Sequence, residues 1–402
     1  MNWYVLAVIP VFGLLVFVHE LGHFLTAKWA GIRVEEFGLG FPPNVVSVRK
    51  RERGGWEVMW FGRSREIDTS STQNPFSGTS GGRSGESAVV PHHTIYSLNL
   101  LPIGGFVRMP GENGDATDDE GNYDSQSFAA KSAGKRIAVL CAGVVMNFLL
   151  GIVLFTIAYS VGQPVATNDP VIGTVQSGSP AQAAGLRPND RVLSVNGQPV
   201  KSFSQMHDVV DKAMKADTHH GATLPVTLVI LHSKSSVPMT IVVNARTHPA
   251  PDSGAMGVSG KVNLVKAPIW EAPIKGVQQT FDFIRTYLGL IGQMIVGAIQ
   301  PQFSGPVGIA RVTGDVAQTV PYYGWWPILS LTAILSLNLA IFNILPFPAL
   351  DGGRVFLILV EILRGGKRLK PEREGLINFV GLAVLLLLMV VVTVSDVLHW
   401  GS

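Results

Sequence analysis

Four long apolar runs constrain this chain more than any other feature of its 402 residues. They cover residues 3–18, 137–161, 325–345 and 376–394. Each approaches the roughly 20 residues that an α-helix needs to cross a bilayer. Because 47% of the residues are hydrophobic and 15% are charged, the composition excludes an intrinsically disordered chain. We therefore predict a polytopic α-helical membrane protein with four transmembrane helices.

Charge and cysteine content exclude several other classes of protein. A formal net charge of +3 is too small to indicate nucleic-acid binding. The single cysteine, Cys141, excludes an internal disulfide framework and a cysteine-based zinc finger. The first apolar run lacks the basic start and the small-residue cleavage site of a secretory signal, and His19 follows it at once. We expect this run to be retained as a membrane helix.

The distribution of lysine and arginine predicts the orientation. Basic residues gather between the first two runs and again between the last two. Since cytoplasmic loops carry an excess of lysine and arginine, both loops are expected to be cytoplasmic. The two termini and the long segment between the second and third runs would then lie on the outer side.

The sequence HELGH at the end of the first run carries the strongest chemical signal. His19 and His23 are four residues apart, so on a helix both imidazoles share one face, as two nitrogen ligands of a tetrahedral zinc require. Glu20 can then act as the general base that takes a proton from water. The alternative is a structural pair of histidines that satisfy each other, but ionisable residues at a membrane helix favour a functional site.

A zinc site of this kind needs a third protein ligand. Glu35 and Glu36 are the acidic residues shortly downstream of HELGH, but Asp351 at the end of the third run is the better candidate. Pro346 and Pro348 must break the helix there, and irregular backbone at membrane depth is tolerated where it lines an enclosed polar site. The alternative role for Asp351 is to cap the next helix.

The outer segment resembles a known module. It contains SPAQAAGL from Ser179 and NDRVLSVNG from Asn189, among short predicted strands and one predicted helix at 204–216. These motifs resemble a PDZ domain of the bacterial protease-associated type. The resemblance implies an α+β domain over 165–250 that binds a peptide or a chain end by strand addition at a sheet edge.

The other segments complete the predicted organisation. Residues 31–135 are expected to form a cytoplasmic or membrane-associated β-hairpin or small sheet, with a flexible Ser/Gly-rich insertion at 64–87. The remaining predicted parts are the first transmembrane helix at 1–30, the second at 136–162, an amphipathic helical linker at 251–322, the third transmembrane helix at 323–353, a cytoplasmic loop at 354–374 and the fourth transmembrane helix at 375–396.

Taken with the PDZ-like segment, HELGH and the sequence NILPFPALDGG from Asn343 resemble the bacterial site-2 proteases of peptidase family M50, in particular their RseP-like members. The resemblance extends over nearly the whole chain. It implies a zinc-dependent intramembrane endopeptidase of the bacterial inner membrane, with its active site towards the cytoplasmic side. It also implies one Zn²⁺ per chain, held by His19, His23 and Asp351, with Glu20 as the catalytic base.

The resemblance implies a substrate site as well. Asn343 would engage the substrate backbone near the scissile bond, and Asn338 would support it. Gly104, Gly105 and Phe106 resemble part of a membrane-associated β-loop that receives the substrate as an added strand. The expected substrates are single-pass membrane proteins, such as a pre-trimmed anti-sigma factor or remnant signal peptides, cleaved within or near their transmembrane segments during regulated intramembrane proteolysis.

The chain departs from this family in two respects. RseP-like members carry two PDZ modules, and one is found here. The family often shows Ala-Gly-Pro before an asparagine in the second span, where this chain has Ala142-Gly143-Val144 before Asn147.

Two other classes of function remain open at this point. One is a membrane-anchored PDZ scaffold with a vestigial protease site, although retention of His19, Glu20, His23 and Asp351 counts against it. The other is a metal transporter, to which four spans without an internal repeat give little support.

Overall fold

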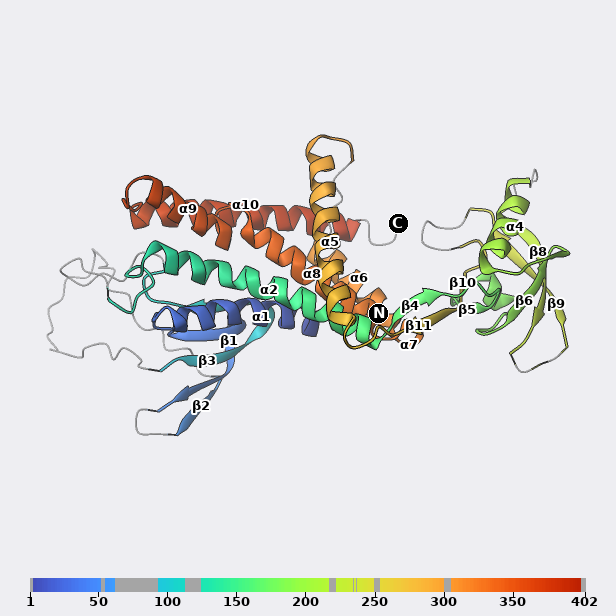
Figure 1. Cartoon of the computed structure of the whole chain (residues 1–402), viewed down its shortest axis with the longest axis horizontal. Helices are drawn as coiled ribbons and strands as arrows, with labels where there is room; N and C mark the ends of the chain where they lie inside the picture. The colour runs from blue at the N-terminus through green and yellow to red at the C-terminus, as the bar shows by residue number, and fades with distance from the viewer. Residues whose placement is uncertain are drawn as a thin grey trace. The chain divides into compact units, whose positions relative to one another are not determined.

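The computed structural model describes residues 3–51, 55–61, 93–112, 124–216, 222–233, 235, 237–248, 254–299 and 305–398 (Figure 1). The chain forms two compact units. Unit 1 comprises Met1–Ile157, Trp270–Gln318 and Ile328–Ser402, and unit 2 comprises Ala158–Ile269 and Thr319–Pro327. The flexible insertion predicted at 64–87 lies outside the described residues.

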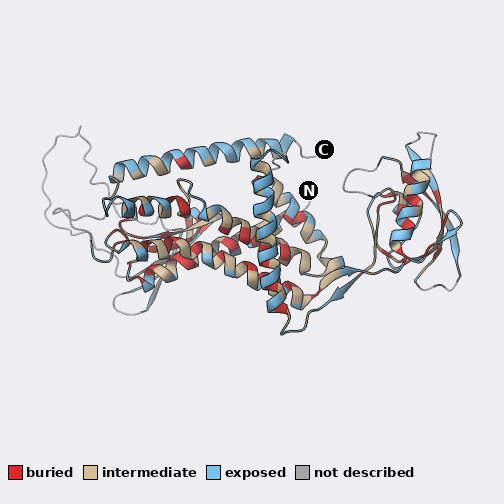
Figure 2. Ribbon diagram, turned by 45° about the horizontal axis from the view of Figure 1, so that its top comes forward, coloured by how far each residue is buried: buried red, intermediate tan, exposed pale blue. Residues whose placement is uncertain are grey.

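Four helices are long and apolar enough to cross a membrane. A short 3₁₀ turn, η1 (Trp3–Ala7), leads into α1 (Val8–Trp29), and the other three are α2 (Ala133–Val161), α8 (Trp326–Ile344) and α10 (Pro371–Leu398). Figure 2 shows α10 almost wholly exposed along its length, and its apolar side chains include Leu386, Leu387 and Val391. Exposed apolar surface of this extent fits a helix that faces lipid. The four helices fit the predicted polytopic membrane protein.

The end of the third apolar run differs from the prediction. The sequence predicts a third span over 323–353, broken at Pro346 and Pro348, and a loop over 354–374, whereas α8 ends at Ile344 and a new helix, α9, covers Asp351–Leu363. Pro346 and Pro348 lie between the two helices, and proline cannot donate the backbone hydrogen bond that continues a helix. A short irregular connection therefore separates two helices.

Close helix packing in unit 1 depends on small residues. A Cβ atom added to Gly22 of α1 would lie 2.5 Å from the carbonyl oxygen of Ala142 in α2. On the other side of α2, a Cβ atom added to Gly151 would lie 2.7 Å from a methyl group of Leu337 in α8. These contacts bring α1 and α8 directly against α2, which is the geometry that small residues permit in membrane helices.

The predicted β region forms a three-stranded sheet in unit 1, with β2 (Trp56–Trp60), β1 (Glu36–Lys50) and β3 (Ile95–Arg108) in that order. Both long strands bend, so residues 36–39 pair with 95–98 and also with 105–108, while residues 44–49 pair with 95–99. Residues 105–108 consequently lie at an edge. Among the described residues, no further strand pairs with them.

Unit 2 has its own sheet and its own core. A four-stranded antiparallel sheet runs in the order β7 (Gln198–Pro199), β6 (Arg191–Val195), β8 (Thr223–Leu231) and β9 (Met239–Arg246). The short α3 (Pro180–Ala183) and α4 (Phe203–Ala216) complete it, and α4 places Met206 and Val210 in the same apolar cluster as Val226, Leu228 and Ile230 of β8.

Two strands of unit 2 lie where the sequence predicts a helical linker at 251–322. Strand β10 (Val258–Gly260) pairs with β5 (Ile172–Val175), and β11 (Val262–Val265) pairs with β4 (Gln163–Ala166). Strands of three and four residues are too short to show a period in the sequence, and partners distant along the chain determine them. Helices do follow, namely α5 (Ala272–Ile295) and α6 (Pro306–Gln318) in unit 1 and α7 (Val320–Tyr323) in unit 2.

Candidate metal centre

Helix α1 brings two imidazoles together, as their spacing predicts. His19 and His23 are both buried, and their ring centroids are 4.8 Å apart. Their Nε2 atoms are 3.2 Å apart. Glu20, between them in sequence, is half-buried and lines a cavity that both histidines also line.

Helix α9 supplies a carboxylate to the same point. Asp351 is its first residue, and the Oδ2 atom lies 3.1 Å from the Nε2 atom of His19 and 3.4 Å from that of His23. Ala349 has a φ angle of 74°, a left-handed conformation that turns the chain before α9 begins. The helix break therefore places the carboxylate, and the N-cap residue, Leu350, forms no side-chain capping hydrogen bond within the described part of the chain.

The spacing of these three atoms fits a metal ion. Zinc binds imidazole nitrogen and carboxylate oxygen at roughly 2.0–2.2 Å, so neighbouring ligand atoms of a tetrahedral site lie roughly 3.3–3.6 Å apart. The three measured distances, 3.1, 3.2 and 3.4 Å, are close to that separation. Nδ1 of His23 donates to the carbonyl oxygen of Val139 at 2.8 Å, so the lone pair of a neutral His23 is on the Nε2 atom that faces the other two groups. Two imidazoles and a carboxylate are a zinc-binding donor set.

A cavity of about 630 Å³ adjoins the three groups. Its lining includes His19, Glu20, His23 and Asp351, together with Gly105 and Phe106 at the edge of β3. Gly104 immediately precedes these edge residues and has a φ angle of 97°. The structure thus brings Glu20, the three candidate ligands and the edge of the sheet to one place.

The two asparagines of α8 are not among the residues that line this cavity. Asn343 is half-buried in the last turn of α8. Asn338 lies further from that end, and its buried Oδ1 atom has no hydrogen-bond partner within the described chain. Their predicted role in substrate binding stays a prediction.

Comparisons with known proteins identify the family. The model of peptidase family M50 matches residues 7–61 and 87–388. The chain belongs to peptidase family M50. A zinc metalloprotease RasP from Geobacillus kaustophilus is 30% identical over 98% of this chain and 97% of its own length. A zinc metalloprotease RasP from Oceanobacillus iheyensis is 29% identical, and the regulator of sigma-W protease RasP from Bacillus subtilis is 27% identical, each over 98% of both chains.

Membership in M50 confirms the predicted RseP-like site-2 protease family and the predicted metalloprotease. It favours the protease over the scaffold and the transporter that the sequence alone left open. The four apolar helices and the relatives fit a multi-pass membrane protein that acts on substrates in the membrane. Zinc is the metal that the names of these relatives imply.

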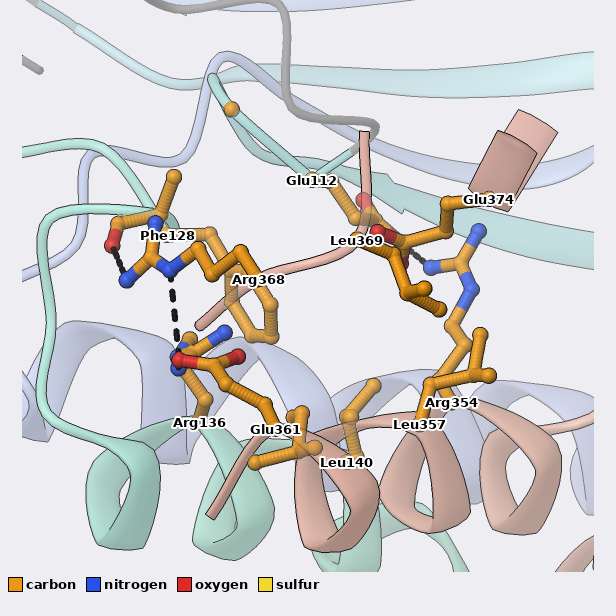
Figure 3. A pocket seen from close by; sticks show the side chains of 13 residues that line it. Glu112, Phe128, Arg136, Leu140, Arg354, Leu357, Glu361, Arg368, Leu369 and Glu374 are labelled. Atoms are coloured by element: carbon orange, nitrogen blue, oxygen red, sulfur yellow. Dashed lines mark hydrogen bonds and ion pairs between the residues drawn. The ribbon is translucent and has the colours of Figure 1, made fainter. Parts of the chain in front are cut away.

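Figure 3 shows a cluster of charged residues in a second pocket, which the sequence alone does not reveal. Glu361 of α9 accepts hydrogen bonds from Arg136 of α2 at 2.7 Å and from Arg368 at 3.3 Å. Arg354, one turn after Asp351, pairs with Glu112. Both members of this second pair line the cavity at the metal centre. The sequence held one signal of this pair: Arg354 follows Asp351 by three residues, and residues three apart on a helix share a face, so Arg354 could be expected near the carboxylate of Asp351.

Burial and charge act in opposite directions on Glu361. Burial raises the pKa of this carboxyl group, but the guanidinium groups of Arg136 and Arg368 outweigh it and hold the pKa below its ordinary value. The ionised carboxylate therefore links α2, α9 and the segment that follows α9.

A face of α2 forms one wall of the candidate metal centre. A Cβ atom added to Gly143 would lie 2.5 Å from Nε2 of His23 and 2.6 Å from Cε1 of His19. Asn147, one turn further along α2, is fully buried, and its Nδ2 atom is 3.3 Å from Nδ1 of His19. In the sequence this segment is a departure from the family pattern and has no predicted role. The four-residue spacing of Val139, Gly143 and Asn147 was a signal, but one sequence does not show which face of α2 meets α1.

Proposed function

We propose that His19, His23 and Asp351 hold one Zn²⁺ per chain and that Glu20 is the catalytic base of a zinc-dependent intramembrane endopeptidase. The observation that carries this proposal is the convergence of two imidazole nitrogens and a carboxylate oxygen at 3.1 to 3.4 Å, next to a cavity that Glu20 lines. Bound zinc supplies Lewis acidity, which acidifies water and polarises a carbonyl group. Glu20 takes the proton from the attacking water and passes it to the leaving amine.

The edge of β3 is the proposed site for the substrate backbone. Gly105 and Phe106 line the cavity, and a Cβ atom added to Gly105 would lie 2.9 Å from Cγ of Glu20. An extended peptide that pairs with residues 105–108 would therefore pass directly by the catalytic base. Gly104 provides the turn that begins this edge. Strand pairing also replaces the backbone hydrogen bonds that a substrate helix loses when it unwinds.

Asn343 and Asn338 are proposed to act on the substrate from α8. Asn343 would hydrogen-bond to the backbone near the scissile bond, and Asn338 would support it. Support for Asn338 comes from its buried Oδ1 atom, which has no partner among the described residues and is thus available as an acceptor.

The proposed substrates are single-pass membrane proteins, such as a pre-trimmed anti-sigma factor or remnant signal peptides, cut within or near the transmembrane segment in regulated intramembrane proteolysis. A relative that carries the name regulator of sigma-W protease supports the first of these. Unit 2 would act as a PDZ domain outside the cytoplasm and bind a peptide or chain end. Both termini would lie on that side of the inner membrane, and the active site would lie towards the cytoplasm, as the basic loops favour.

The test of this function combines zinc content with cleavage of a reporter single-pass membrane protein by the full-length enzyme. We expect wild type to bind about one zinc per chain and to cleave. Glu20→Gln should keep the metal and lose cleavage, because it removes the base and leaves the ligands. Asp351→Ala should lose metal and cleavage together. Asp315→Ala, on the exposed surface of α6, is the matched control and should behave as wild type.

Two results would refute the proposal. One is a wild-type protein that cleaves without any bound metal. The other is cleavage by Glu20→Gln at the wild-type rate.

A further inference from the structure

The face of α2 that meets α1 offers one polar group to each histidine. Val139, Gly143 and Asn147 are four residues apart and share that face. The carbonyl oxygen of Val139 accepts from Nδ1 of His23 at 2.8 Å. The Nδ2 atom of Asn147 lies 3.3 Å from Nδ1 of His19. Gly143, between them, leaves the space that both rings occupy.

The hydrogen bond at His23 fixes its tautomer. A backbone carbonyl can only accept, so Nδ1 of His23 must carry the proton. In a neutral ring the Nε2 atom then has a free lone pair, which is directed at the point where Asp351 and His19 converge. Metal-binding histidines commonly have such a partner on the other ring nitrogen.

The same requirement applies to His19. Its Nε2 atom lies 3.1 Å from Oδ2 of Asp351, so this nitrogen must present a lone pair if it binds a metal. Nδ1 must then carry the proton and needs an acceptor. The Asn147 side chain can provide one, because a half-turn about its last bond exchanges the amide oxygen and nitrogen at nearly the same positions.

The environment of Asn147 is consistent with this role. The side chain is fully buried, and its Oδ1 atom has no hydrogen-bond partner within the described residues. The carbonyl oxygen of Asn147 accepts from Oγ of Ser336 of α8 at 2.8 Å, so this bond does not involve the side-chain amide. A buried amide therefore lies next to an imidazole, with its oxygen free to accept.

We propose that Asn147 is a positioning residue for the metal centre: its Oδ1 atom accepts a hydrogen bond from Nδ1 of His19 and so directs the Nε2 lone pair of His19 towards the metal. This inference rests on the proposed zinc site. It gives the two histidines equivalent partners on one helix, a backbone carbonyl for His23 and a side-chain amide for His19.

The test compares substitutions of Asn147 in the full-length, detergent-solubilised protein. Asn147→Leu keeps the approximate volume and removes the acceptor, whereas Asn147→Asp keeps an acceptor at the same place. Ser336→Ala is the matched control, because it removes the bond to the Asn147 backbone and leaves the amide beside His19. The readouts are the zinc dissociation constant, from competition with a chelator, and the visible absorption of the Co²⁺-substituted protein.

We expect Asn147→Leu to weaken zinc binding about 10- to 100-fold and to change the cobalt spectrum. Asn147→Asp should bind zinc at least as tightly as wild type, and Ser336→Ala should match wild type in both readouts. If Asn147→Leu does not fold, Asn147→Ala takes its place with the same expected loss.

Wild-type zinc affinity and an unchanged cobalt spectrum in Asn147→Leu would overturn the inference. So would an Asn147→Asp variant that binds as weakly as Asn147→Leu. Failure of the wild-type protein itself to bind zinc would instead overturn the proposed function, so the two failures are distinguishable.

Discussion

A side chain added at Gly143 would collide with both imidazoles of the proposed metal centre. We predict that Gly143→Ala lowers zinc affinity at least about tenfold and cleavage about 100-fold, because the new methyl group would displace both imidazoles. Zinc titration and reporter cleavage measure the two effects. Gly134→Ala in the same helix is the control, since a Cβ atom there meets nothing within 4 Å. Equal zinc affinity in the two variants would contradict the prediction.

The lowered pKa of Glu361 determines how this residue's contribution to the free energy of unfolding depends on pH. Because its pKa is lower in the folded state than in the unfolded chain, its ionisation stabilises the fold above the unfolded-state pKa of about 4.3. That contribution is lost as the pH falls through the folded-state pKa. We expect Glu361→Gln to cost about 1–3 kcal/mol at pH 7, because it leaves the buried Arg136 without its anionic partner.

Thermal melting in detergent between pH 7 and about pH 3 tests this expectation. The difference in melting temperature between wild type and Glu361→Gln should shrink as the solution becomes more acidic. Glu57→Gln removes a more exposed pair with Arg49 and should have a smaller effect at every pH. A difference that grows towards acid would show that the sign is wrong.

At the scale of residues, the sequence was most informative where spacing defines geometry. The four-residue interval places His19 and His23 on one face of α1, and the helix-breaking prolines pointed to Asp351. Asn147 and Glu361 could not be assigned in the same way. Their partners lie on other helices, so their roles depend on which helix faces meet, and one sequence does not contain that information.

At the scale of elements, the first turn of α9 depends on Gly352 and Gly353, where an added Cβ atom would meet backbone carbonyl oxygens. Gly353 packs against the carbonyl oxygen of Phe347, and a Cβ atom there would overlap it. We predict that Gly353→Ala shifts this turn, moves Asp351 away from the histidines and lowers zinc affinity about tenfold or more. Gly375→Ala in α10 is the control, because a Cβ atom there has open space. Zinc titration of both variants measures this effect. An unchanged zinc affinity in Gly353→Ala would contradict the prediction and show that α9 tolerates the methyl group.

The helices of the membrane-crossing type were predictable because each is a long apolar run. The break between α8 and α9 was only partly predictable from the sequence, because prolines mark where a helix stops but not where the next helix begins. Strands β10 and β11 were missed because three or four residues carry no periodic signal and because β5 and β4 determine their pairing from a distance.

At the scale of the whole molecule, the two units have separate cores. Among the residues that the structure describes, the apolar cluster of unit 2 shares no residue with the two clusters of unit 1. We predict that Leu228→Ala, at a fully buried position in β8, destabilises unit 2 by about 2–5 kcal/mol and leaves the zinc affinity of unit 1 unchanged. Calorimetry and zinc titration of the full chain measure the two quantities. Val237→Ala, at an exposed position, is the control, and a parallel loss of zinc affinity in Leu228→Ala would show that the units are coupled.

The polytopic character and the family were predictable at this scale, because paired motifs and apolar runs extend over nearly the whole chain. The extent of unit 2 along the chain was not predictable from the sequence. Its strands continue to Val265, and part of it returns at Thr319–Pro327, so contacts between distant segments define it.

The connection between α8 and α9 also has a consequence for biosynthesis. A ribosome makes His19 and His23 with α1, whereas Asp351 follows only after α8 has been completed. A nascent chain therefore carries two of the three groups from the synthesis of α1 until that of α9. We expect a protease built in this order to remain inactive until α9 has been made, so that prematurely terminated chains that stop before α9 cannot damage neighbouring membrane proteins.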